Sequence, residues 1–169
     1  MSMKPNVLIL GIGNYDRQDD GVAWHILQSI KRKLDRPTDL QPYDATGEPE
    51  GEESPKTLFS LQLFPEMVDV IARFDAVVFV DAHTGAIKED LQFREIQAAQ
   101  QANPLTHHMT PEALLALVQI ATSKNPTAVL VSVRGFSFQY KQELSTKTTE
   151  LAEAAVEKIW KWLHQDQCR

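Results

Sequence analysis

The chain has 169 residues, of which 43% are hydrophobic and 24% are charged, and its formal net charge is -6. This length suits one domain, which we expect over residues 1–169, and this composition is typical of a folded chain rather than a disordered one. A protein that binds a phosphate backbone needs a surplus of Lys and Arg, so the acidic balance excludes nucleic acid as an expected partner.

The N-terminal apolar run over residues 7–13 is too short to span a bilayer, and it leads directly into a glycine-rich turn. Cys168 is the single cysteine, so no internal disulfide forms within the chain, which is typical of a reducing compartment. We therefore expect a cytoplasmic protein without membrane contact, and a monomer or weak oligomer.

The apolar pattern predicts an alternation of strands and helices. Continuous apolar runs indicate buried strands, a spacing of three or four residues indicates helices, and strict alternation indicates an edge strand. In chain order, we predict a strand at 6–10, a helix at 20–34, a weak strand at 40–43, a helix at 63–73, a strand at 76–80, an edge strand at 91–96, a helix at 110–121, a strand at 128–133 and a helix from residue 145.

Local residues mark several of the predicted boundaries. Thr110 suits the N-cap of its helix and Pro111 its first position, and Asp19 or Asp20 suits the N-cap of the first helix. Pro65 lies near the first turn of the helix at 63–73. The acidic segment 44–56 is rich in Gly and Pro, so we expect an exposed, flexible loop there.

This order of elements predicts an α/β fold with three layers, α/β/α. At its centre we expect a mostly parallel, twisted, five-stranded sheet with one antiparallel edge strand, flanked by helices on both faces. In an open sheet of this kind the active crevice lies at the carboxyl ends of the strands. The loops after Leu10, Val80 and Val133 are therefore the places to look for chemistry.

The first of these loops has the sequence GIGNYDRQDDG, residues 11–21. Its glycines allow a sharp turn, but the dinucleotide fingerprint needs a third glycine where Asp16 stands. Asp19 and Asp20 would also repel a pyrophosphate at the helix N-terminus, and these acids suit a cation instead. Because the two are adjacent, they point in different directions. We expect Asp19 to cap the helix and Asp20 to face the crevice; the alternative is that both only cap the helix.

Other candidates lie on loops that we expect to converge on this one. Asp81 ends a central strand, where it is either a functional acid or a turn former. His107 and His108 come just before a helix, and histidine binds nickel or zinc in sites that carboxylates share. The alternative for the two histidines is an exposed position on a polar loop.

Four segments, in order, resemble the nickel-iron hydrogenase maturation peptidases, enzymes that remove the C-terminal extension of a hydrogenase large subunit once nickel is inserted. These segments are VLILGIGNYDRQDDGVAWHIL, LQLFPEMVDVIARFDAVVFVDA, THHMTPEALL and VSVRGFSFQYKQELS. The resemblance covers nearly the whole chain and implies the phosphorylase/hydrolase-like version of the α/β/α sandwich.

The resemblance implies a metal site made by an acid of the first loop, a middle acid and a histidine. The first position falls on Asp20, six residues after Asn14 of the G-x-G-N motif, and the third falls on His107, with His108 as the alternative. The Asp-Gly-Gly-Thr stretch common at the middle position is absent. Gln62 is the substitute ligand that we consider there.

The implied function is that of a metal-recognising endopeptidase acting on a hydrogenase large-subunit precursor. The implied metal is the nickel carried by the precursor, or another divalent metal in the same site. Asp20 is the expected catalytic residue. Either the metal polarises the peptide carbonyl or activates water, or Asp20 acts as a general base, so the enzyme is of the aspartic or metal-assisted type.

Two other functions stay open at this point. The chain lacks H-E-x-x-H and G-x-S-x-G, so neither a helix-borne zinc protease nor a serine hydrolase of the nucleophile-elbow type fits. A nucleotide or small-molecule binding module on a similar sheet is one alternative, and a non-catalytic assembly factor on the same fold is the other. For contacts with a protein substrate we expect Arg134 and the acidic segment 44–56.

Overall fold

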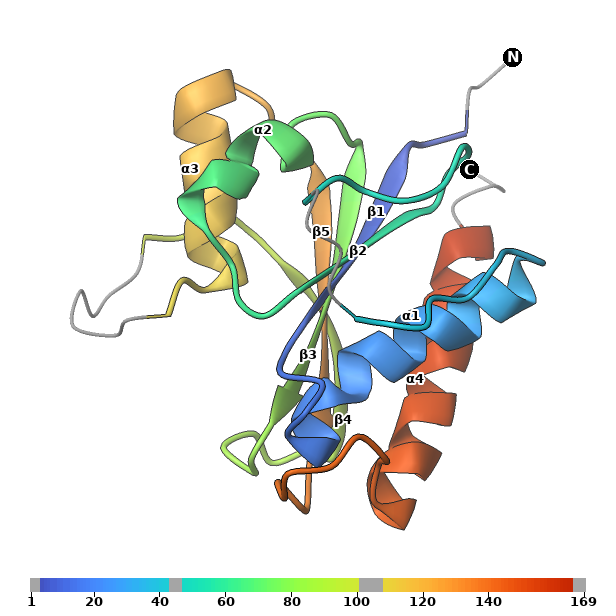
Figure 1. Cartoon of the computed structure of the whole chain (residues 1–169). Coiled ribbons are helices and arrows are strands. Elements are labelled where there is room, and N and C mark those ends of the chain that lie inside the picture. The colour runs from blue at the N-terminus through green and yellow to red at the C-terminus, as the bar shows by residue number, and fades with distance from the viewer. Residues whose placement is uncertain (1–3, 43–46, 101–107, 166–169) are drawn as a thin grey trace.

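The computed structural model of the chain describes residues 4–42, 47–100 and 108–165 (Figure 1). Its centre is a five-stranded sheet in the order β2-β1-β3-β5-β4. The strands are β1 (Val7–Ile12), β2 (Lys56–Ser60), β3 (Ala76–His83), β4 (Leu91–Ile96) and β5 (Thr127–Arg134). All neighbouring pairs are parallel except β4 with β5, so the predicted mostly parallel sheet with an antiparallel edge strand is confirmed.

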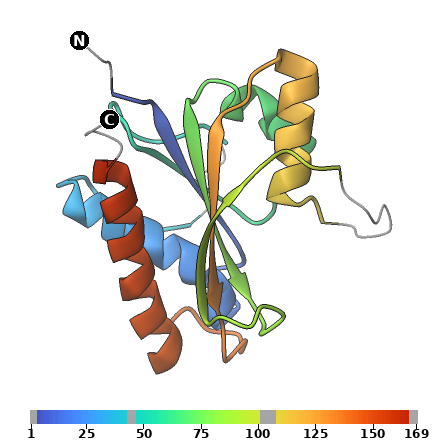
Figure 2. The same cartoon turned by 180° about the vertical axis from the view of Figure 1, so that it is seen from behind.

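Helices cover both faces of this sheet, which confirms the three-layer α/β/α fold. Figures 1 and 2 show α1 and α4 together on one face and α2 and α3 on the other. The α-helices are α1 (Val22–Lys33), α2 (Val68–Ile71), α3 (Pro111–Thr122) and α4 (Thr146–Gln165), and the short 3-10 helices η1 (Gln18–Gly21) and η2 (Pro65–Met67) precede α1 and α2.

The apolar run of β1 is continuous because the strand is buried on both faces. Val7 and Ile9 pack in the layer of α1 and α4, whereas Leu8 and Leu10 pack in the layer of α2 and α3. Side chains of a strand alternate between faces, so a central strand needs apolar residues at every position. The same reasoning accounts for the equally apolar runs of β3 and β5.

The predicted strand at 40–43 is wrong. Residues 40–42 form bends, Leu40 is 97% exposed, and Tyr43 lies outside the described residues. The second strand of the sheet is instead β2 (Lys56–Ser60), which lies at the edge and pairs with β1 alone. Its first and last residues, Lys56 and Ser60, are polar, so the strand contains too short an apolar run to be predicted from the sequence.

The helix predicted at 63–73 is shorter than expected. It consists of η2 followed by the single turn of α2, which ends at Ile71. Pro65 occupies the first position of η2, as predicted. The cap of α3 is also confirmed, since the Thr110 hydroxyl accepts a hydrogen bond from the Ala113 N–H at 3.2 Å.

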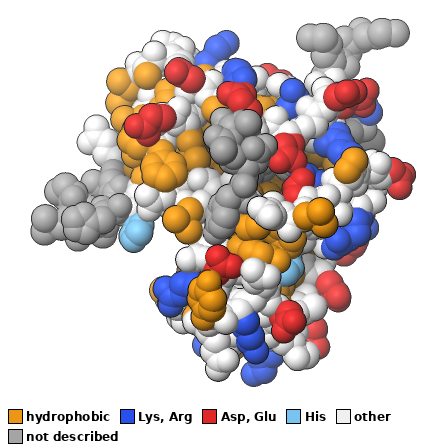
Figure 3. Space-filling model, viewed as in Figure 1, with side chains coloured by type: hydrophobic (Ala, Val, Ile, Leu, Met, Phe, Trp, Pro, Cys, Tyr) orange, Lys and Arg blue, Asp and Glu red, His pale blue; other side chains and the backbone are white. Residues whose placement is uncertain are grey.

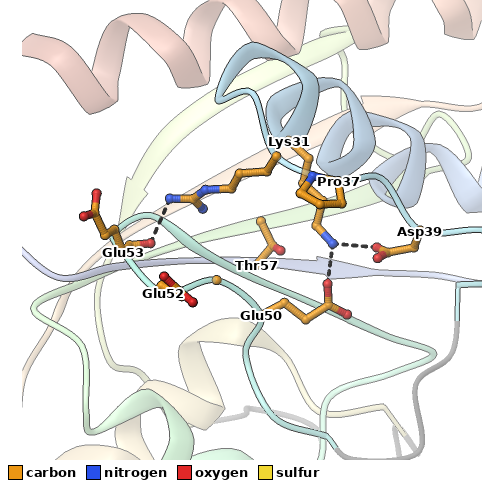
Figure 4. A pocket seen from close by; sticks show the side chains of 9 residues that line it. Lys31, Pro37, Asp39, Glu50, Glu52, Glu53 and Thr57 are labelled. Carbon is orange, nitrogen blue, oxygen red and sulfur yellow. Dashed lines mark hydrogen bonds and ion pairs between the residues drawn. The ribbon is translucent and has the colours of Figure 1, made fainter.

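The described part of the acidic segment, residues 47–55, is held against the edge of the molecule (Figure 4). Lys31 is only 5% exposed, and its ammonium group donates to the carboxylates of Asp39 and Glu50. Arg36 donates to the carbonyl oxygens of Pro55 and Glu53. The residues around these bonds line an open pocket of about 460 Å³. The segment is therefore exposed over much of its length, as predicted, but two cations fix its course.

Two further features concern the surface. Figure 3 shows hydrophobic side chains gathered over α2 and α3 on the face seen in Figure 1. Along the described ranges, no helix combines the length and the apolar character that crossing a membrane requires.

Cys168, the single cysteine, lies outside the described residues.

Candidate functional site

The candidate site lies where the parallel strands end. In the sheet, Ile12 of β1 stands beside Ser60 of β2, and Gly11 stands beside Val80 of β3. Just beyond the strands, the Gly13 N–H donates to the carbonyl of Ser60 at 3.0 Å. The loop after β1 therefore lies between the loop after β2 and the end of β3, as the rule for open sheets predicts.

Close packing of the loop after β1 explains its glycines. Gly13 has φ +148°, and a Cβ there would stand 2.0 Å from the carbonyl oxygen of Asp20. At Gly21, a Cβ would stand 2.8 Å from the Cα of Tyr15. The glycines thus let the loop fold back on itself and bring residue 20 to residue 13, and no phosphate is needed to account for them.

Asp19 is fully buried and does not cap α1, so this prediction is wrong. The N-cap of α1 is Gly21, which makes no side-chain capping bond. The Asp19 carboxylate instead accepts four hydrogen bonds from the loop between β5 and α4. The donors are the N–H of Phe136 (2.8 Å), the N–H of Ser137 (2.9 Å), and the N–H (2.8 Å) and hydroxyl (2.7 Å) of Ser145.

These bonds decide the charge state of Asp19. Burial raises the pKa of this carboxyl, but the hydrogen bonds from Ser145, Phe136 and Ser137 outweigh burial and hold the pKa below its ordinary value of 3.8. Asp19 is thus a buried anion that ties the first loop of the site to the last one.

Asp20 lies close enough to Asp81 for its negative charge to act on that carboxyl group. Asp20 is half-buried, and its Oδ2 accepts from the Asn14 N–H at 3.0 Å. Burial, assisted by the negative charge of Asp20 and opposed by a hydrogen bond from the Ala82 N–H, raises the pKa of Asp81 to about 7. A carboxyl group with such a pKa is both an acceptor and a source of a proton near neutral pH, which is typical of functional sites.

The comparisons with known proteins identify this architecture. No protein-family model and no curated protein sequence matches the chain. Among solved structures, the hydrogenase maturating endopeptidase HybD from E. coli aligns with a TM-score of 0.65 and 16% identity over 95% of this chain and 93% of that one. The nickel-iron hydrogenase maturation protease HycI from Thermococcus kodakarensis KOD1 aligns with a TM-score of 0.61 and 24% identity over 94% of this chain and 92% of that one.

This is the fold of the nickel-iron hydrogenase maturation proteases. An endopeptidase from Escherichia coli, solved in solution, has the same fold, with a TM-score of 0.66 and 16% identity over 95% of this chain and 93% of that one. The fold implied by the resemblance in the sequence is therefore confirmed.

On this maturation-protease fold, the remaining predicted site residues lie in different surroundings. Asn14 shapes the first loop, since its Oδ1 accepts from the Asp16 N–H at 3.0 Å. Gln62 is half-buried just beyond β2, where its backbone carbonyl accepts from the Ser60 hydroxyl at 2.8 Å. His108 is exposed just before α3, and His107 lies outside the described residues.

No group of three His, Cys, Asp or Glu side chains suited to a metal ion occurs within residues 4–42, 47–100 and 108–165. In that part of the chain, the structure brings Asp20 and Asp81 together, and no hydrogen bond joins the Gln62 side chain to either of them. The ligand set Asp20, Gln62 and His107 stays a prediction.

His83 was not among the site residues that the sequence analysis predicted. It follows Asp81 by two positions on β3, so both side chains lie on the same face of the sheet. Its partner in the register of β3 and β5 is Arg134, which the sequence analysis assigned to substrate contact. The period of two along β3 was the available signal, but the residues after Asp81 suggested a turn instead.

Proposed function

We propose that this chain is an endopeptidase that removes the C-terminal extension of a nickel-iron hydrogenase large-subunit precursor after nickel insertion. The Asp20–Asp81 pair carries this proposal, because two neighbouring acids stand at the active edge of a sheet with this fold. Two solved structures that share the fold, HybD and HycI, are named as hydrogenase maturation enzymes, which supports the choice of reaction and substrate.

The chemistry of the pair suits a divalent metal carried by the substrate. Carboxylate oxygens and a histidine nitrogen are ligands that nickel accepts. Two negative charges held side by side repel each other, and a cation between them relieves that repulsion. Asp81 therefore serves better as the middle ligand than Gln62, whereas His107, with His108 as the alternative, remains the proposed imidazole ligand.

The reaction itself has two possible routes. In the first, the nickel of the precursor polarises the scissile carbonyl or activates the attacking water. In the second, Asp20 accepts a proton from that water as a general base.

The loop geometry favours this proposal over a nucleotide-binding module. A phosphate bound at the start of α1 would need backbone N–H groups of the glycine-rich loop. Here the Asn14 N–H already donates to the carboxylate of Asp20. The exposed hydrophobic side chains of Leu61 (51%) and Phe64 (39%), on either side of Gln62 in sequence, suit contact with a polypeptide.

The experiment is incubation of the purified chain with a nickel-loaded hydrogenase large-subunit precursor, followed by intact mass measurement of the precursor. We expect the mass to fall by that of a C-terminal peptide. The same precursor without nickel serves as the substrate control, and Asp20→Asn and Asp81→Asn serve as enzyme controls. A complex that forms without any mass change would identify a non-catalytic assembly factor instead, and the absence of both binding and cleavage would refute the proposal.

A further inference from the structure

His83 and Arg134 lie side by side at the carboxyl edge of the sheet. They are register partners on the parallel strands β3 and β5, whose backbones are about 4.8 Å apart. Along β3, Phe79 packs in the layer of α2 and α3, and the alternation of the strand places Asp81 and His83 on that same face. Two residues along a strand span about 6.6 Å, so the pair lies within one dipeptide length of Asp81.

Each of these side chains carries a buried nitrogen atom without a hydrogen-bond partner. The Nδ1 of His83 accepts from the Gly85 N–H at 3.1 Å, so the proton of the neutral ring resides on Nε2. Neither this Nε2 nor the Nε of Arg134 meets an acceptor among the described residues. Buried donors are normally paired because an unpaired one costs free energy, so two on neighbouring strands need an explanation.

The rest of the Arg134 side chain shows what kind of acceptor fits. Its Nη1 donates to Asp90 at 3.0 Å, and the two side chains are 38% and 50% exposed. An ion pair this exposed contributes little free energy, so Asp90 leaves the guanidinium able to attract a second carboxylate. A guanidinium binds a carboxylate best through two parallel N–H groups, and the Nε side of Arg134 is unused.

Two cationic side chains meet at one aromatic ring beside the pair. The guanidinium of Arg134 stands 5.0 Å from the centre of the Phe136 ring, and the ammonium of Lys147 stands 5.1 Å from the centre of the same ring. These two positive charges lie on the last strand of the sheet and in the first turn of α4, beside the carboxyl edge. An incoming negative charge is therefore attracted to this corner.

We infer that His83 and Arg134 form a subsite for a carboxylate of a bound peptide, with the His83 Nε2–H and the Arg134 Nε–H as its donors. An acidic side chain or a terminal carboxylate binds the unused Nε edge of the guanidinium, beside Asp90 on Nη1, and satisfies both orphaned donors. The inference rests on the proposed function in one respect, the identity of the molecule that carries the carboxylate. Under that function, this molecule is the precursor peptide held close to Asp20 and Asp81.

The segment between β3 and β4, residues 84–90, lies beside this subsite. Its backbone lies against the guanidinium, since a Cβ at Gly85 would stand 3.3 Å from the Nη2 of Arg134. All residues of the segment except Ile87 are exposed, and the Arg134 N–H holds the end of the segment by donating to the Asp90 carbonyl at 2.8 Å. The carboxylate therefore reaches the Nε edge past the exposed part of the segment, while the Asp90 backbone stays in place.

The test measures binding, not cleavage, on the full chain labelled with ¹⁵N. The probes are the peptides acetyl-Ala-Glu-Ala-amide and acetyl-Ala-Gln-Ala-amide, with inorganic phosphate as a second anion. We expect the Arg134 Nε–Hε resonance to shift with the Glu peptide and not with the Gln peptide or phosphate. Arg134→Lys keeps the charge but loses the fork of donors, so it should weaken binding about ten-fold.

A matched control separates this subsite from general charge effects. Arg94→Lys changes another strand arginine, whose Nη2 is paired with Glu112 at 2.9 Å, and it should leave the affinity unchanged. His83→Phe keeps an aromatic ring but removes the donor, and it serves where Arg134→Lys disturbs the fold. Equal shifts with both peptides, equal binding of phosphate, or undiminished binding by both site variants would overturn the inference.

The two proposals fail separately. Binding of the Glu peptide without cleavage of any nickel-loaded precursor would refute the proposed function and leave the subsite standing. Cleavage of a precursor by wild-type protein that does not bind the Glu peptide would do the reverse.

Discussion

Replacing Asp19 by alanine removes the acceptor of four hydrogen bonds from a fully buried position. The donors on Phe136, Ser137 and Ser145 then lose a charged partner, and bonds to charged groups are worth about 1.5–3 kcal/mol each. Water reaches some of the half-exposed donors after the change, so we expect a net loss of about 3–5 kcal/mol. For a chain of this length, such a loss lowers Tm by roughly 6–20 °C.

The assay is urea unfolding, followed by circular dichroism and by tryptophan fluorescence. Asp19→Asn is the companion variant, because its amide keeps the shape but points an N–H₂ group at donors, so it should lose nearly as much stability. Asp16→Ala is the control from the same loop, since among the described residues its carboxylate accepts a single side-chain hydrogen bond, from the exposed Gln142 at 3.1 Å. An Asp19→Ala free energy of unfolding within about 1 kcal/mol of wild type would refute the reasoning, since that is the value of one ordinary hydrogen bond.

Three further predictions test other parts of the molecule. Asp20→Asn should reduce cleavage of the nickel-loaded precursor about 10²- to 10⁴-fold, measured by intact mass over time, with an unchanged unfolding midpoint as evidence that the fold persists. Gly13→Ala should destabilise the chain by more than about 2 kcal/mol in urea unfolding, because its Cβ meets the Asp20 carbonyl, whereas Gly47→Ala has a positive φ but open space and should cost less. Burial raises the pKa of Asp39, but bonds from Lys31 and Gln28 outweigh it and lower the pKa below 3.8. The stabilisation from Asp39 is therefore fully present above the pKa of the unfolded chain and is lost as the pH falls through the pKa of the folded chain. The difference in free energy of unfolding between wild type and Asp39→Asn should accordingly shrink below about pH 4. A difference that stays constant with pH would contradict this.

The sequence could predict those parts of the fold in which burial produces a pattern of apolar residues within one short segment. β1, β3 and β5 are buried on both faces over most of their length, so each contains a continuous apolar run that stands out in the sequence. β2 lies at the edge of the sheet, where only β1 is its neighbour. Its polar residues Lys56 and Ser60 interrupt the apolar run that would mark it as a strand. Its place in the sheet depends on pairing with β1, which lies far away in sequence.

The site divides in the same way. The loop motif led to Asp20 because acids directly after a glycine-rich turn stand out locally. The role of Asp19 stayed hidden because its partners are 117 to 126 positions further along the chain. The pairing of Asp81 with Asp20 also depends on the neighbourhood of β1 and β3, and no local pattern shows it.

The ties between the first and last loops also determine when this site becomes complete. Besides the Asp19 bonds, the Gln18 N–H donates to the Lys141 carbonyl at 2.8 Å, so the N-terminal loop is organised by residues from the final quarter of the chain. A ribosome delivers those residues last, and contacts this distant in sequence form slowly. A growing chain therefore carries Asp20 for most of its synthesis without the support that fixes it, and the active edge is assembled at the same time as α4.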